Sequence, residues 1–353
     1  MRSIGESIPL LILGFQTALL SGHPLSETPP QMTTESATWV RQGLIGLGSR
    51  QEHSVAAINN TIYVVGGVIH DDTYSLVTTA RVESFDTEQN QWAVPAPLPR
   101  PINHVNLASV EGKLFSFCGL YGQSPEDPVW LAVPECNQYD PHADTWTPIA
   151  PMPGAARGSS AMGVHGSTVY VAGGMSRLEA TADGTQDALA DVSSYDTATD
   201  TWNEDYPPLP GPRQHAGGAV VNGVMYVLGG REYVENHFNT VFALDLAKPD
   251  TWEEKARMPT SRGGLACAAL KDRYIVCAGG EGNSDNPLGV FEETEVYDTE
   301  LDEWTKLPPM EVARHGTAAV SVGNRFYVPG GGSATGGLGG TGGIFDYLLF
   351  GDL

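Results

Sequence analysis

The chain has 353 residues, among them 42 Gly and 25 Pro, and only 17% of its residues are charged. Its formal net charge of −23 argues against binding to nucleic acid or to an anionic membrane surface, because both are negatively charged as well. No long run shows helical periodicity. The composition therefore predicts one compact all-β domain.

The first residues are expected to form a targeting segment. Arg2 precedes an apolar stretch from Ile8 to Leu20, and the small residues Ser21 and Gly22 follow. This order is typical of a secretory signal peptide (residues 1–22), too short and wrongly flanked for a membrane span. A buried or disordered N-terminal segment is the alternative. We expect a linker (23–36), a folded domain (37–353), and a protein that is secreted or lies in the lumen of the secretory pathway.

A short apolar run that ends in a pair of small residues recurs six times along the rest of the chain. The pairs, spaced 50 to 56 residues apart, are Gly66-Gly67, Cys118-Gly119, Gly173-Gly174, Gly229-Gly230, Gly279-Gly280 and Gly330-Gly331. Each run is followed by an Asp, and in five units a Trp comes six or seven residues after it: Trp92, Trp146, Trp202, Trp252 and Trp304. A period of this length indicates stacked supersecondary units.

This pattern resembles the kelch repeat, and the resemblance covers residues 38–347. It implies an all-β fold, a six-bladed kelch β-propeller. The sixth unit reaches Phe345-Asp346 without a Trp strand of its own, whereas Thr38-Trp39-Val40-Arg41 precedes the first unit. We therefore predict that this N-terminal strand completes the last sheet and closes the ring, which leaves no open sheet edge. Trp130 lies outside the repeated framework.

The four cysteines and one sequon fit an oxidising compartment. Cys118 ends the second strand of its unit and Cys136 begins the third, so we predict a Cys118–Cys136 disulfide across neighbouring strands. Cys267 and Cys277 flank a turn at Lys271-Asp272. A two-residue turn would place their thiols on opposite faces of the sheet, which predicts free thiols. The sequon Asn59-Asn60-Thr61 in a hairpin turn makes Asn59 a candidate glycosylation site.

Basic residues gather at one end of the predicted propeller, which we call the Arg-and-His face. Its arginines, near the start of each first strand, are Arg50, Arg100, Arg157, Arg213, Arg262 and Arg314. Four histidines follow them, at His53, His104, His215 and His315. Because the first two strands of a unit form a hairpin, the loops after each small-residue pair lie at the same end. These loops add Arg231, Tyr121, Trp130, Tyr233, Phe238 and Phe291.

These residues make up the predicted site, and each also has a structural interpretation. His104 and His215 both lie fourteen residues before a small-residue pair and so occupy equivalent positions. We assign catalysis to His104, His215, Arg100 and Arg213. We assign ligand binding to His53, His315, Arg50, Arg314, Arg231, Tyr121, Trp130, Tyr233, Phe238 and Phe291. Repeated arginines can instead bind loop carbonyl oxygens. The four histidines come from different units at differing offsets, so we expect no metal and no cofactor.

In architecture and size the chain is similar to secreted fungal kelch-like enzymes of natural-product biosynthesis, the hetero-Diels–Alderases. This resemblance implies metal-free dehydration and cycloaddition in the central funnel, joining an oxygenated aromatic substrate to an apolar partner. Two alternatives stay open: a sialic-acid mutarotase or epimerase, which Asp71, Asp72, Glu281 and Asp285 would suit, and a non-catalytic binding propeller for protein or glycan. We expect a monomer or a weak homo-oligomer.

Overall fold

The structure is a computed structural model that describes residues 1, 32–33, 37–71, 75–122, 128–179, 184–336 and 341–351. The chain divides into residues 1–31 and 32–353, and the fold below belongs to the second unit. The predicted signal peptide, apart from Met1, lies outside the described residues, as does the predicted linker apart from residues 32–33. Within the described part, no helix has the length and hydrophobicity needed to cross a membrane.

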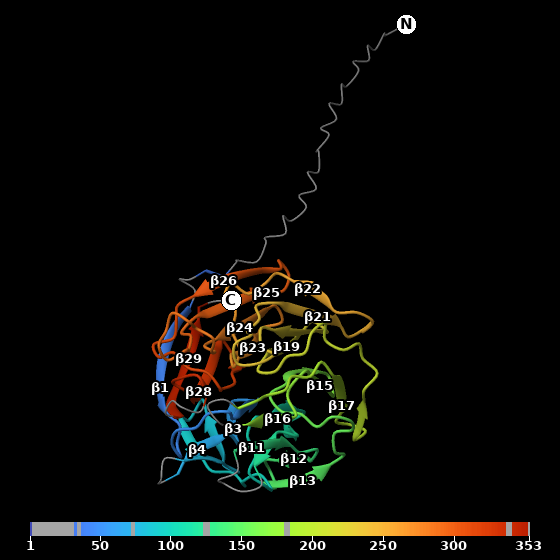
Figure 1. Ribbon diagram of the computed structural model, residues 1–353. Coiled ribbons are helices and arrows are strands. Elements are labelled where there is room, and N and C mark those ends of the chain that lie inside the picture. Colours follow the sequence, from blue (N-terminus) through green and yellow to red (C-terminus); the bar gives the residue numbers. More distant parts are fainter. Residues whose placement is uncertain are drawn as a thin grey trace. The chain divides into compact units, whose positions relative to one another are not determined.

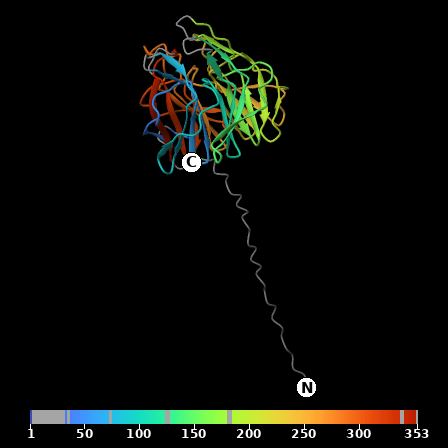
Figure 2. The same cartoon turned by 90° about the horizontal axis from the view of Figure 1, so that it is seen from below.

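The described residues form six four-stranded antiparallel sheets arranged around a central axis (Figure 1), and Figure 2 views the same ring from its side. The first three sheets are β2 (Ser54–Ile58), β3 (Thr61–Val65), β6 (Val82–Asp86) and β7 (Gln91–Ala93); β8 (Asn106–Val110), β9 (Lys113–Phe117), β12 (Cys136–Asp140) and β13 (Thr145–Ile149); and β14 (Ala161–His165), β15 (Thr168–Ala172), β17 (Val192–Asp196) and β18 (Thr201–Asn203). The other three are β19 (Gly217–Val221), β20 (Val224–Leu228), β21 (Val241–Asp245) and β22 (Glu253–Lys255); β23 (Ala266–Leu270), β24 (Tyr274–Ala278), β25 (Thr294–Asp298) and β26 (Glu303–Leu307); and β27 (Val320–Val322), β28 (Arg325–Gly332), β29 (Thr341–Phe350) and β1 (Ala37–Leu44). Two small sheets lie in the loops: β10 (Leu120–Gly122), β11 (Val129–Ala132) and β16 (Arg177–Glu179), and the pair β4 (Val68–His70) and β5 (Leu76–Thr78).

The apolar runs of the sequence are the second strands of the sheets. In β3, Ile62, Val64 and Val65 are completely buried, and Tyr63 packs with its ring centroid 6.0 Å from that of Tyr139 in the next sheet. A strand covered on both faces by neighbouring sheets has no solvated side, so its sequence is a continuous apolar run instead of an alternation.

The small-residue pair after this strand lets the chain turn close to its neighbour. Gly66 has φ +68°, a left-handed conformation, and a Cβ there would lie 2.4 Å from the carbonyl oxygen of Ile102. A side chain at this position would therefore collide with the backbone leading into the next sheet.

The predicted N-terminal strand closes the ring. β1 pairs antiparallel with β29, with Trp39 opposite Leu348, and in Figure 1 β1 lies at the outer edge of the sheet that holds β28 and β29. Trp39 Nε1 donates a 2.9 Å hydrogen bond to the carbonyl oxygen of Pro308. The framework residues Trp146, Trp202, Trp252 and Trp304 make the same bond to a carbonyl in the preceding unit. Trp39 thus supplies the Trp that the sixth unit lacks, as predicted.

The predicted disulfide is wrong. The structure joins Cys267 to Cys277 and leaves Cys118 and Cys136 as buried free thiols. Five of the inner hairpins have the predicted two-residue turn, whereas β23–β24 pairs Leu270 with Tyr274 around a three-residue loop. This extra residue shifts the register by one and sets Cys267 directly opposite Cys277 on the same sheet face.

The other two thiols lie next to each other but are not bridged. Cys136 pairs with Phe117, so Cys118 lies one position past it, where φ is +55° and the chain turns away. The Sγ atom of Cys118 contacts Met152 Sδ at 3.6 Å, and that of Cys136 points to the carbonyl oxygen of Pro134.

Candidate functional site

One residue just before the first strand of each sheet has a left-handed backbone, with φ between +51° and +60°. These six residues, which we call the axial ring, are Glu52, His104, Ser159, His215, Gly264 and Gly316. Each donates its backbone N–H to the carbonyl oxygen of the ring member in the preceding sheet, over 2.6–3.1 Å. The bond from Glu52 N to Gly316 O completes the circle. The axial ring therefore brings one residue from every sheet to the axis of the propeller.

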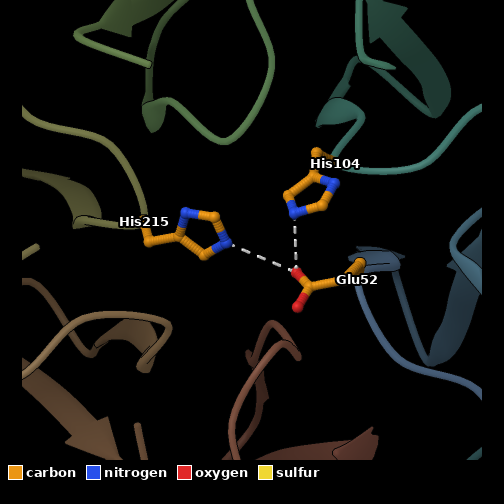
Figure 3. Close-up of side chains that lie close together, drawn as sticks. All are labelled: Glu52, His104 and His215. Atoms are coloured by element: carbon orange, nitrogen blue, oxygen red, sulfur yellow. Dashed lines mark ion pairs between the residues drawn. The ribbon is translucent and has the colours of Figure 1, made fainter. Parts of the chain in front are cut away.

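Three side chains of the axial ring meet at the axis. Figure 3 shows Glu52, His104 and His215 pointing toward one another from three different sheets. Glu52 Oε2 lies 3.1 Å from Nε2 of His104 and 3.5 Å from Nε2 of His215. The side chains of the two histidines are 2% and 3% exposed, and that of Glu52 is 13% exposed. We call these three residues the axial cluster.

The residue before each histidine fixes the orientation of its ring. His104 Nδ1 is 2.5 Å from Oδ1 of Asn103, and His215 Nδ1 is bonded to Oε1 of Gln214. Arg231 Nε, which can only donate, also binds Gln214 Oε1, so this atom is an acceptor and His215 Nδ1 must carry a proton. Both histidines consequently direct Nε2 at the carboxylate of Glu52.

Burial sets the charges within the axial cluster. Removal from water lowers the pKa of His215 to about 4, and the nearby positive charge of Arg231 acts in the same direction. Contact with the Glu52 carboxylate acts in the opposite direction, because it favours a proton on the His215 ring. Burial by itself would raise the pKa of Glu52, but its interactions with His104 and His215 outweigh burial and hold that pKa well below its usual range.

A cavity of about 520 Å³ extends from the axial cluster along the first strands. Glu52, His104 and His215 line one end of it, and Asn59 and Ser109 line it near the hairpin turns. Its walls are mostly small or apolar and include Ala56, Leu107, Ala108, Met162, Val220 and Ala268. None of the five loop aromatics predicted to bind ligand is among its lining residues. The cavity therefore lies on the hairpin-turn side of the axial ring, not beneath an aromatic mouth on the Arg-and-His face.

Trp130 approaches the axial cluster from the opposite side. It lies in β11 and is buried, with its ring centroid 6.1 Å from that of His104. An apolar cluster surrounds it, made by Val68, Leu120, Met175 and Leu178. Trp130 thus covers His104 on the loop side, away from the cavity.

The remaining predicted aromatics are spread over the loops. Tyr121 lies under the guanidinium of Arg100, and Phe238 lies under that of Arg213. Phe291 is buried and Tyr233 is half exposed. These four do not converge on one site.

The repeated arginines are structural in five sheets. Arg50, Arg157, Arg213, Arg262 and Arg314 are buried and bind backbone carbonyl oxygens of their own sheets. Arg262, for example, binds the carbonyl oxygens of Gly279 and Glu293 and forms an ion pair with Glu295. Such a guanidinium has few donors left for a ligand.

The catalytic roles predicted for Arg100 and Arg213 do not fit this placement. In five sheets the arginine lies two residues before the axial-ring member, and in the second sheet buried Ile102 takes this position. Arg100 is therefore out of register with the other arginines and forms an ion pair with Glu135 that is partly exposed to solvent. The guanidinium of Arg213 binds Gly229 O and Thr240 Oγ1 within its own sheet.

His53 and His315 also lie near the axis but outside the axial cluster. His53 donates Nε2–H to the carbonyl oxygen of Pro329, and burial lowers its pKa to about 3. His315 binds the carbonyl oxygen of Ala334 through Nε2, while its Nδ1 is 3.4 Å from Glu281 Oε2. Arg231 forms an ion pair with Glu281 beside it, so Arg231 serves a buried charge network.

Two functional candidates were missing from the predicted site. Glu52 lies fourteen residues before Gly66, the same offset that links His104 and His215 to their small-residue pairs, and this spacing could have identified it. Glu281 directly follows Gly279-Gly280 and was weighed only as a carbohydrate ligand. The predicted equivalence of His104 and His215 agrees with the structure, where their ligand atoms lie within 4.8 Å of each other and of Glu52. The expectation of no metal rested on the differing offsets of all four histidines, and this pair shares one offset.

Four-stranded antiparallel sheets arranged in a ring define a β-propeller. The sequence profile of the KLHDC2/KLHL20/DRC7 Kelch-repeats domain matches residues 153–331, and that of the Kelch motif matches residues 49–99. The chain belongs to the kelch-repeat family.

The chain is similar to several longer kelch proteins. The Kelch-like protein terF of Aspergillus terreus is 35% identical over 289 residues, which is 81% of this chain and 62% of that protein. Kelch-like protein 35 of Mus musculus is 27% identical over 241 residues, 68% of this chain and 37% of that protein. The chain thus spans less than two thirds of the length of these relatives. The structure of YjhT superposes with a TM-score of 0.69 at 17% identity over 86% of this chain and 95% of that one, which shows a shared fold.

Proposed function

We propose that this chain is a small-molecule enzyme whose reaction takes place in the cavity beside the axial cluster. One observation carries the proposal: two imidazoles and a carboxylate from three separate sheets converge at the end of the cavity. A structural histidine such as His53 forms a hydrogen bond from Nε2 to a backbone carbonyl oxygen. His104 and His215 instead direct Nε2 at Glu52, at the end of the cavity. Convergence of titratable groups in a concave site is typical of catalysis.

The proposed reaction is loss of water from an oxygenated ring followed by cycloaddition, as expected from the resemblance to hetero-Diels–Alderases. In an ortho-hydroxybenzyl alcohol, the ring hydroxyl gives up its proton while the benzylic C–O bond breaks and water leaves. The product is an ortho-quinone methide, whose oxygen and exocyclic carbon form two bonds to an alkene. The axial cluster would accept and return the proton and polarise the leaving hydroxyl.

The cavity suits a pair of reactants of this kind. Its volume of about 520 Å³ lies within the roughly 300–1,000 Å³ typical of small-molecule sites. The polar end at Glu52 fits the oxygenated ring, and the apolar wall at Leu107, Met162 and Val220 fits an alkene. Holding both reactants in one cavity would contribute several kcal/mol by removing the entropic cost of their encounter.

The setting of this reaction is proposed as well. We infer natural-product assembly, entry into the secretory pathway through residues 1–22, and action as a monomer or a weak homo-oligomer. Asn59 lies exposed in the β2–β3 turn, where a glycan is sterically possible, and its glycosylation stays a prediction. The names of these relatives refer to kelch repeats and to no reaction, so support for the chemistry comes from the axial cluster and the cavity.

The test incubates the purified chain with a panel of ortho-hydroxybenzyl alcohols and an electron-rich cyclic alkene. We expect an adduct with the summed mass of the two reactants minus water, enriched in one enantiomer on chiral chromatography. His104→Ala and His215→Ala should reduce the rate at least tenfold, about 1.4 kcal/mol of barrier. His165→Ala, an exposed histidine at the end of β14, is the control and should match the parent. Racemic adduct at the uncatalysed rate across the panel, or binding without turnover, would overturn the proposal.

A further inference from the structure

The ring nitrogens that His104 and His215 present to the axis are available as ligand atoms. Nδ1 of each histidine faces a side-chain amide oxygen, that of Asn103 or Gln214, and donates to it. This outer hydrogen bond is the one that metal-binding histidines commonly make, because it fixes the ring and leaves Nε2 to the ion. The amide of Asn103 is oriented by its Nδ2, which donates to Thr78 Oγ1. For His215 the assignment is supported by Arg231, whose donors orient Gln214.

The two separations between Glu52 and the histidines match those around one ion. Ligand atoms about 2.1 Å from a common ion are about 3.0 Å apart at octahedral right angles and about 3.4 Å apart in a tetrahedron. Glu52 Oε2 lies 3.1 Å and 3.5 Å from the two Nε2 atoms, and all three atoms lie within 4.8 Å of one another. The carboxylate oxygen is thus already at coordination spacing from both imidazole nitrogens.

The axial ring holds this arrangement in place and leaves one side open. Glu52, His104 and His215 all have φ between +51° and +53°, a conformation that costs a non-glycine residue roughly 1 kcal/mol or more and persists where the surroundings impose it. The other three ring members are small: Ser159, Gly264 and Gly316. At Gly316 a Cβ would lie 2.5 Å from Glu52 Oε1, so glycine makes room for the carboxylate. Three ligands beside an open cavity are typical of a catalytic metal site.

We propose that Glu52 Oε2, His104 Nε2 and His215 Nε2 bind one divalent transition-metal ion, of the class that includes Zn²⁺ and Fe²⁺. Two imidazoles and one carboxylate with free positions form the ligand set that both ions accept in enzymes. The free positions face the cavity, where an oxygen of a bound small molecule would complete the coordination. This inference stands on the geometry of the axial cluster and not on the proposed reaction, although a bound ion would supply the polarisation assigned there to the cluster.

Zn²⁺ is the probe for the test. The full chain, without an affinity tag, is stripped with a chelator, dialysed, and titrated with Zn²⁺ by calorimetry, with the metal content measured by mass spectrometry. We expect one ion per chain, and a loss of affinity of at least a hundredfold in Glu52→Gln and His104→Ala. His165→Ala, which removes an exposed histidine, should bind as the parent does. Circular dichroism at matched temperature separates loss of a ligand from loss of the fold.

Cobalt substitution gives a second readout that does not require the variants. Co²⁺ in the stripped chain should produce visible absorption typical of four or five nitrogen and oxygen ligands, and this absorption should disappear on addition of Zn²⁺. No ion retained by the parent, or equal binding by the parent and both ligand variants, would overturn the inference. Metal binding without turnover of the alcohol panel leaves this inference standing and rejects the proposed function. Turnover by a chain that binds no metal in the titration supports the proposed function and overturns this inference.

Discussion

Buried charge in this propeller is consistently paired or hydrogen-bonded. Arg50, Arg262 and Arg314 each combine backbone carbonyl oxygens with one acidic partner, respectively Glu83, Glu295 and Asp346. An unpaired guanidinium at such a depth would cost several kcal/mol, so partner and arginine must be retained together. The same rule applies beside the axis, where Arg231 depends on Glu281.

The Arg231–Glu281 pair predicts a dependence of stability on pH. Burial alone would raise the pKa of Glu281, but Arg231 and His315 outweigh it and lower the pKa to about 2, below the ordinary value of 4.5. A lowered folded-state pKa stabilises the fold above the unfolded pKa, and this stabilisation is lost as the pH falls from about 4.5 toward 2. Glu281→Gln should reduce the free energy of unfolding by about 3–5 kcal/mol at pH 7, because it strands a buried charge.

Chemical denaturation at several pH values measures both effects. The free energy of unfolding of Glu281→Gln should fall less steeply between pH 5 and 3 than that of the parent. Glu111→Gln, which changes an exposed turn residue, should lie within about 0.5 kcal/mol of the parent at each pH. Parallel pH profiles for the parent and Glu281→Gln would contradict the assigned pKa shift.

At the scale of elements, β1 and the inner hairpins decide how the ring is assembled. β1 comes from the start of the folded unit and completes a sheet whose other strands come from its end. Without it, the backbone of β29 would present a free edge to other chains. The hairpin β23–β24 shows how one residue of loop length changes covalent structure, since its three-residue loop brings Cys267 and Cys277 together.

Trp39 is the residue through which this closure can be tested. Its ring packs against Phe326, with centroids 6.4 Å apart, and its Nε1 binds the carbonyl oxygen of Pro308. Trp39→Ala should lower the free energy of unfolding by about 2–4 kcal/mol, because a partly buried aromatic side chain is removed. Trp39→Phe keeps most of the packing and loses only the hydrogen bond, so about 1 kcal/mol is expected. Equal unfolding midpoints for the parent and Trp39→Ala would mean that closure does not depend on this strand.

At the scale of the whole molecule, the axial ring joins all six four-stranded sheets in one circle of backbone hydrogen bonds. Its members are spaced about one repeat apart in the sequence, so no local contact could bring them together. The circle is complete only when the first and last sheets meet at Glu52 and Gly316. Assembly of the axial cluster is therefore coupled to closure of the propeller.

Gly316 offers a test of this coupling with a matched control. Gly316→Ala should cost about 1 kcal/mol through its φ of +60°, and should also displace Glu52, whose Oε1 lies 2.5 Å from the added Cβ. Gly323 has φ +61° with no atom within 4 Å of a Cβ, so Gly323→Ala carries the backbone cost alone. The unfolding midpoints of both variants should fall by a similar amount. The imidazole NMR signals of His104 and His215 should move only in Gly316→Ala. Signals unchanged in both variants would show that Glu52 does not depend on this glycine.

The sequence alone determined the features that repeat with a fixed spacing. The apolar runs identified the second strands because burial on both faces requires them, and the missing sixth Trp identified β1 as the closing strand. His104 and His215 lie at the same offset from their small-residue pairs, and this repeated spacing predicted that they occupy equivalent positions. Each of these features depends only on local periodicity and on the need to leave no sheet edge unpaired.

The tertiary structure decided what depends on register and on the curvature of the ring. A loop one residue longer than predicted reversed the disulfide assignment, and Ile102 in place of an arginine moved Arg100 out of the repeated position. Glu52 joined the two histidines because side chains from three sheets meet only when the whole ring closes, across separations of about fifty residues or more in the sequence. Spacing along the chain identifies equivalent positions, but only the closed ring brings their side chains to a common axis.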